Sequence, residues 1–256
     1  KLIAFINDYI KSRENDKLEK RKIMNGLANI ATYGIRNPFN YTMTDTELKF
    51  LKSEELVKLV KNLLKYPHKI LYYGPSNKAQ LLDILSKYHK GNFPTRVLPN
   101  SYPFTYKKTN TNEVNFSNYD MVQTEISWCR NAAIYNPVNV PITNLFNEYF
   151  GGGMSGIVFQ TIRESKALAY STYAVYGSAY KSGEPNYIRA YVGCQADKMK
   201  DAVSSMQELL DTLPYSERLF DITKTSLKNN YATSRMQKQQ ILFQYLDALR
   251  HDISYD

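Results

Sequence analysis

The sequence predicts an α+β fold, and three patterns support that prediction. Residues 122–129 alternate Val, Thr, Ile and Trp with polar residues and Cys, which is typical of a strand with one buried face. Elsewhere apolar residues recur three or four positions apart, as on the buried face of a helix. The strands occur in pairs with helices grouped after them. This order favours an antiparallel-rich sheet with helices packed on one face over a doubly wound parallel sheet.

The composition is that of a globular protein. The 256 residues are 43% hydrophobic and 22% charged, which excludes a disordered tail or a fibre. No stretch approaches the roughly 18 apolar residues of a membrane helix, so we expect no membrane span. Lys1 opens directly onto an amphipathic pattern that contains Asp8, so a signal peptide, if one exists, lies before Lys1.

Residues 1–90 are predicted to form several helices and one strand. Thr44 and Glu47 have the spacing of a capping box, in which each side chain bonds the other residue's backbone N–H. Residues 91–112 combine three prolines with many Asn, Thr and Tyr, and they predict a linker at a domain boundary. The other elements expected in this part are a helix over 2–10, a helix over 23–31 before Gly34, a helix capped by Ser53, a strand over 69–73 and a helix capped by Ser76.

Residues 113–256 are predicted to form a second unit that begins with strands. Its strongest helical stripe follows Asp197, which has the position of an N-cap. The expected elements are strands over 113–116 and 122–129, helices over 142–150 and 155–165, strands over 169–176 and 187–195, the helix after Asp197, and helices from Ser216 and from about Gln239.

A glycine run at residues 151–156 matches the pattern G-x-G-x-x-G. That pattern predicts a dinucleotide site only when it follows a strand, and here it follows the helical stripe over 142–150. A phosphate-binding Walker loop is excluded because no Gly-Lys-Ser/Thr follows. We therefore expect the glycines to end one helix and to allow close backbone packing before the next.

The few cysteines and histidines do not predict a metal site. Cys129 and Cys194 each lie in a strand-like run, which favours two buried thiols over one disulfide. His68, His89 and His251 are far apart in the sequence and share no ligand spacing. We expect no metal site built by this chain alone.

Three nearby segments, FGGGMS (150–155), FQTIRE (159–164) and ALAYS (167–171), carry a family resemblance. Together they resemble the non-catalytic half of the insulinase/pitrilysin zinc metallopeptidases, which include the mitochondrial processing peptidases. That family repeats one α+β domain and holds zinc on an H-x-x-E-H helix in its first repeat. The resemblance implies a mitochondrial-processing-peptidase-like metallohydrolase repeat. In it, residues 1–90 are the C-terminal part of one repeat and 113–256 are most of the following one.

Arg163 and Tyr170, seven positions apart, match a pair that this family uses on its substrate. The resemblance implies that Tyr170 stabilises the transition state by hydrogen bonding to the developing oxyanion, and that Arg163 positions the peptide. From the residues alone, Arg163 is a solvated helix residue and Tyr170 is one of 22 tyrosines, packed at a strand end.

The chain contains no H-x-x-E-H. The resemblance therefore implies that Zn²⁺ is bound by another part of the full-length protein or by a partner subunit. It also implies that this chain is a fragment, inactive alone, of a zinc endopeptidase that cleaves peptides or unfolded proteins. The alternative is a catalytically inactive subunit that acts as a peptide-binding or scaffold partner. The sequence leaves the compartment open between the bacterial periplasm or cell envelope and the cytoplasm.

The net charge of +9 raises a third possibility, nucleic-acid binding. Residues 1–115 carry 20 basic and 10 acidic side chains, and Lys17, Lys20, Arg21 and Lys22 form a basic patch. No nucleic-acid-binding module accompanies that patch. A solvated helix face is the favoured interpretation, and we expect no nucleic-acid partner.

Overall fold

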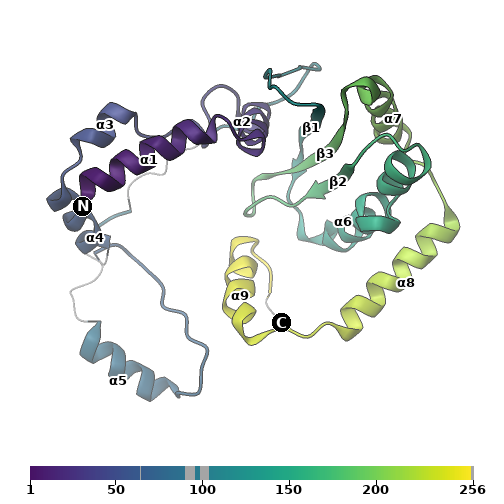
Figure 1. Ribbon diagram of the computed structural model, residues 1–256. Helices are drawn as coiled ribbons and strands as arrows, with labels where there is room; N and C mark the ends of the chain where they lie inside the picture. The colour runs from purple at the N-terminus through teal and green to yellow at the C-terminus, as the bar shows by residue number, and fades with distance from the viewer. Residues whose placement is uncertain (64, 90–95, 99–103, 255–256) are drawn as a thin grey trace.

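The computed structural model describes residues 1–63, 65–89, 96–98 and 104–254. At its centre is an antiparallel sheet of three strands in the order β1-β3-β2 (Figure 1). The strands are β1 (Gln123–Ile134), β2 (Ser171–Gly177) and β3 (Pro185–Gln195). With helices packed against this sheet, the α+β prediction is confirmed.

One face of the sheet forms the core. Ala190, Val192 and Cys194 of β3 are fully buried there, because alternate residues of a strand point to the same side. Two helical segments and α7 (Met199–Thr212) cover this face. The first segment is α6 (Val140–Phe146) with its π-helical continuation η2 (Asn147–Gly151), and the second includes the π-helical turn η4 (Phe159–Ser165).

The last two helices are α8 (Glu217–Thr233) and α9 (Ile241–Arg250). Ser216 caps α8 through its side-chain oxygen, which confirms the predicted start of this helix. The hydroxyl of the buried Tyr149 also fixes the backbone that leads into α8. It donates to the Pro214 carbonyl at 3.0 Å and accepts from the Ser216 amide at 2.7 Å.

The first part of the chain is helical. It contains α1 (Leu2–Asp16), α2 (Lys20–Tyr33), α3 (Asp45–Phe50), α4 (Ser53–Leu63) and α5 (Lys78–Tyr88). The predicted capping box of Thr44 and Glu47 is present at the start of α3. Figure 1 shows that α5 lies apart from the sheet, whereas α2 lies beside β1.

Two predicted strands and three predicted caps are wrong. Ser53 is the first residue of α4, and its hydroxyl donates to Glu54 at 3.1 Å instead of accepting from a backbone amide of the first turn. Residues 69–73 and 113–116 have no strand partner in the described chain, and Val114 and Phe116 are largely exposed. Asn77, not Ser76, caps α5, because Asn77 and Gln80 can form a reciprocal capping box. Asp197 lies within a 3-10 turn, Ala196–Lys198, so its backbone is already helical before α7 begins.

The described part of the predicted linker, residues 104–112, contacts the rest of the fold. The Lys107 amide donates to the Thr32 carbonyl at 2.8 Å, and the Tyr106 hydroxyl donates to Glu184 at 3.1 Å. Residues 90–95 and 99–103 lie outside the described residues. The boundary at residues 91–112 therefore stays a prediction.

Candidate functional site

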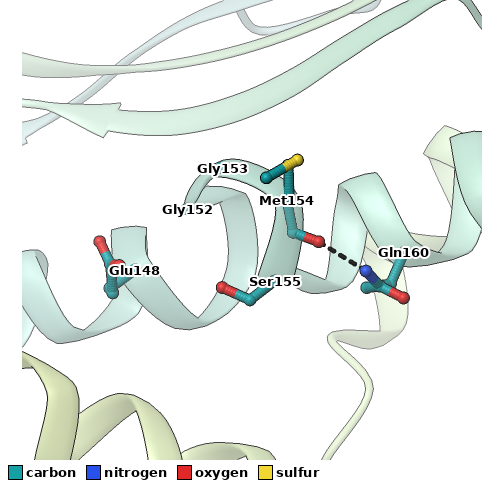
Figure 2. A pocket seen from close by; sticks show the side chains of 6 residues that line it. All are labelled: Glu148, Gly152, Gly153, Met154, Ser155 and Gln160. Carbon is teal, nitrogen blue, oxygen red and sulfur yellow. Dashed lines mark hydrogen bonds between the residues drawn. The ribbon is translucent and has the colours of Figure 1, made fainter.

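The glycine run forms a tight turn between η2 and η4 (Figure 2). A Cβ atom at Gly151 would lie 1.7 Å from the Ala174 carbonyl oxygen, so the turn lies directly against the backbone of β2. A Cβ at Gly156 would likewise lie 2.6 Å from the Gly152 nitrogen. The predicted helix end with close backbone packing is confirmed.

A shallow pocket adjoins this turn. Figure 2 shows its lining residues, and the Gln160 side-chain amide donates to the Met154 carbonyl at 2.5 Å. Glu148 is its only titratable side chain among the described residues, so the pocket offers no acid–base pair. It is lined by Glu148, Gly152, Gly153, Met154, Ser155 and Gln160.

Arg163 lies in η4 next to a completely buried residue. Its neighbour Ile162 is completely buried, so the segment is fixed to the core while the Arg163 side chain remains about half exposed, at 47%. The guanidinium carbon lies 4.8 Å from the centre of the Phe159 ring, and Nε lies 3.8 Å from the Glu164 carboxylate. Such π-helical turns are rare and are frequent at functional sites.

Tyr170 lies immediately before β2. Its backbone amide donates to the Gly193 carbonyl at 2.9 Å, which adds it to the sheet ladder, while 54% of the residue is exposed. Two lysines hold the connection from η4. Lys166 Nζ donates to Ser205 Oγ at 2.6 Å, and Lys198 Nζ donates to the Ala167 carbonyl at 2.9 Å. The backbone at Tyr170 is therefore well anchored.

The two side chains do not bond each other. Among the described residues, no hydrogen bond or ion pair joins Arg163 to Tyr170. They lie at the two ends of one short connection that is anchored to the core and to α7. Both are about half exposed.

The histidines and cysteines do not fit a zinc site. His68 and His89 are far apart in the sequence but come together in the fold, where His68 Nε2 lies 2.8 Å from His89 Nε2. Still, no group of three His, Cys, Asp or Glu side chains within the described ranges could hold a metal ion. Cys129 and Cys194 are free thiols; Cys194 is buried, which raises its pKa, and Cys129 is partly buried.

The face of the sheet opposite the core carries residues that the sequence analysis did not single out. Tyr187, Arg189 and Tyr191 alternate along β3 with its buried residues. The strand register places Cys129 and Val175 on either side of Arg189. The alternation of Tyr187, Arg189 and Tyr191 with apolar residues along β3 is the sequence pattern that could have identified this face.

Two tyrosine rings on this open face stack on each other. The Tyr173 and Tyr191 ring centres are 5.3 Å apart. Burial raises the pKa of Tyr191 to about 12 and also raises the pKa of Tyr173, where Arg189 acts in the opposite direction. Both phenols are therefore protonated hydrogen-bond donors at neutral pH.

The basic patch of the first part is largely paired. Lys17 lies 2.7 Å from Glu14, Lys20 lies 2.8 Å from Glu125, and Lys22 lies 3.4 Å from Asp16. These ion pairs support the interpretation as a solvated helix face over a nucleic-acid site. None of the described helices is long and apolar enough to cross a membrane.

Comparison with known proteins decides the family. The model of the peptidase M16 inactive domain matches residues 54–227, which include the glycine turn, Arg163 and Tyr170. The chain belongs to the peptidase M16 family. This membership confirms the resemblance to the insulinase/pitrilysin peptidases.

The chain is also similar to individual proteins. The chain is 35% identical over 86 residues to "Uncharacterized zinc protease YmxG" of Bacillus subtilis; this match covers 34% of the chain and 19% of YmxG. The crystal structure of a peptidase M16 inactive domain from Pseudomonas fluorescens has a TM-score of 0.67 and 14% identity, and covers 99% of this chain and 61% of that one. The periplasmic protease PqqL from Escherichia coli has a TM-score of 0.70 and 12% identity, with coverage of 98% and 28%.

These two solved structures show the fold alone, because their sequence identity to this chain is low. The chain spans less than two thirds of each of these relatives. The activity of a full-length protein is therefore a proposal.

Proposed function

We propose that this chain is the non-zinc half of a zinc-dependent endopeptidase that cleaves peptides or unfolded proteins. Arg163 and Tyr170 are its contribution to the active site. The observation that carries the proposal is the placement of these two exposed side chains on one core-anchored connection, inside the segment matched by the M16 inactive domain.

The chemistry follows from the two side chains. Peptide hydrolysis develops negative charge on the scissile carbonyl oxygen, and the Tyr170 hydroxyl donates a hydrogen bond to that oxyanion. Arg163 presents several N–H donors in a fixed fork, which suits peptide carbonyls or an acidic group of the substrate. Arg163 Nε lies 3.8 Å from the Glu164 carboxylate, which is beyond hydrogen-bond distance, so these donors remain accessible.

The zinc ion belongs to another segment in this proposal. The described residues offer no ligand set for it, and the relative YmxG is named a zinc protease. A zinc-bearing half of the same protein or a partner subunit therefore supplies the metal. Residues 113–256 form most of one α+β repeat, residues 1–90 form the closing part of the preceding repeat, and residues 91–112 link them.

The full-length protein provides the test. It is expected to hydrolyse an unstructured peptide, to lose this activity when a chelator removes the metal, and to regain it with added Zn²⁺. Residues 1–256 alone are expected to be inactive. Hydrolysis that survives complete metal removal, or full activity of residues 1–256 alone, would contradict the proposal.

A second candidate function is an inactive peptide-binding or scaffold subunit. It is favoured by the matching family model, which describes an inactive domain. The sequence upstream of Lys1 discriminates between the two candidates, because an H-x-x-E-H supports the enzyme and its absence supports the scaffold. Peptide binding without hydrolysis by the zinc-supplemented full-length protein would also favour the scaffold.

A further inference from the structure

The open face of the sheet contains an arginine for which the described residues provide no carboxylate partner. Arg189 lies on the central strand β3 and is partly buried. Its Nε atom is buried and bonds no acceptor, and no carboxylate of the described chain lies within ion-pair distance of its guanidinium. Taking a charge partly out of water without a counter-ion costs free energy. A negatively charged group on this face would offset that cost.

Aromatic side chains frame Arg189. The Tyr187 ring centre lies 5.7 Å from its guanidinium carbon. A Cβ on Gly177 would lie 2.1 Å from the Tyr187 ring, so the ring packs directly against the backbone of β2. The stacked Tyr173 and Tyr191 border Arg189 towards the other end of the strands. The face thus presents a guanidinium between phenol rings.

The charge of this face is positive. α2 lies over β1 on the same side, and the Asn131 side-chain amide donates to the Thr32 carbonyl at 3.0 Å. Glu125 is an acidic residue of this region; Lys20 neutralises it at 2.8 Å, and its carboxylate also interacts with the Tyr191 hydroxyl. Arg21, which lies near Tyr191, and Arg189 leave an excess of positive charge.

We propose that Arg189 and its neighbouring tyrosines bind a carboxylate of a peptide, either its C-terminal carboxylate or an acidic side chain. A guanidinium fork pairs with a carboxylate through two parallel hydrogen bonds, and the Tyr187 hydroxyl beside it adds a further donor. One arginine suits a singly charged carboxylate. This inference rests on the proposed function in one respect: it takes from it that the ligand is a peptide.

The test measures binding of three labelled peptides to the metal-free full-length protein, so that no peptide is cleaved. The peptides share one unstructured sequence without acidic side chains. The first has a free C-terminus, the second is amidated, and the third is amidated but carries one Glu. At least one of the two acidic peptides is expected to bind about tenfold or more tightly than the neutral one, since hydrogen bonds to charged groups are the stronger ones. The tighter of the two identifies the source of the carboxylate.

Arg189→Gln is expected to abolish this preference and to leave the affinity for the neutral peptide unchanged. Arg130→Gln is the matched control, because it removes one exposed positive charge from the neighbouring strand β1. Tyr187→Phe keeps the ring and removes only its hydroxyl, and it is expected to weaken acidic-peptide binding severalfold. If Arg189→Gln does not fold, Arg189→Lys keeps the charge without the fork and should retain only part of the preference.

Three results would overturn the proposal. One is equal affinity of the wild type for all three peptides. A second is an unchanged preference for acidic peptides in Arg189→Gln or, if that variant does not fold, an unchanged preference in both single variants Arg189→Lys and Tyr187→Phe. The third is a loss of stability in Arg189→Gln without any change in peptide affinity, which would mean that another part of the protein pairs with Arg189. Because the protein is free of metal, these results do not depend on whether it is a peptidase.

Discussion

Replacing Tyr170 with Phe in the full-length protein is expected to lower kcat for peptide hydrolysis by about 100- to 1,000-fold. The substitution removes one hydroxyl, the donor proposed to stabilise the oxyanion. The ring and the backbone bond from the Tyr170 amide to Gly193 remain. The measurement is steady-state hydrolysis of an unstructured peptide, with the zinc content determined on the same samples.

Zinc content is expected to stay unchanged, because Tyr170 is not proposed to bind the metal. Tyr180→Phe is the control, since Tyr180 is also largely exposed but lies beyond the other end of β2. It is expected to leave kcat unaltered. A Tyr170→Phe protein with wild-type kcat would show that Tyr170 has no role in the transition state.

Gly151→Ala is expected to destabilise the fold by at least about 3 kcal/mol. The new methyl group would lie 1.7 Å from the Ala174 oxygen and 2.7 Å from its carbonyl carbon. Both atoms belong to the backbone of β2, so no side-chain rotation can relieve the overlap. The turn and β2 would have to separate, and β2 begins next to Tyr170.

Chemical denaturation measures this change. Trp128, the one tryptophan of the chain, packs against the core and reports unfolding through its fluorescence. Gly153→Ala is the matched control. Apart from its chain neighbours, no described residue has an atom within 4 Å of the new methyl group, and the φ of +55° costs an alanine only about 1–2 kcal/mol. Unfolding of Gly151→Ala at the same denaturant concentration as the wild type would contradict the close packing of Gly151 against β2.

The sequence predicted correctly those helices and strands whose defining pattern lies within the element's own residues. The alternation around Trp128 and the capping box of Thr44 both reappear in the structure. The strand over 69–73 was wrong because a strand also needs a neighbour to bond, and a local pattern does not show one. Residues 155–165 were expected to be helical, but nothing in their spacing distinguishes a π-helical turn from an α-helix.

The candidate site shows the same limit. Arg163 and Tyr170 came from the family resemblance, because an exposed arginine and a tyrosine at a strand end look ordinary when taken singly. The approach of His68 to His89 depends on how the chain folds back around α5. Arg189 became notable only when the strand register showed which residues surround it.

The position of zinc in a crystal of the full-length protein tests the central claim most directly. An anomalous difference map recorded at the zinc absorption edge locates the metal without any assumption about its ligands. We expect the peak on residues outside 1–256, with the Tyr170 hydroxyl and the Arg163 guanidinium facing the same space. A zinc ion bound by side chains of residues 1–256, or one remote from Tyr170, would contradict the account.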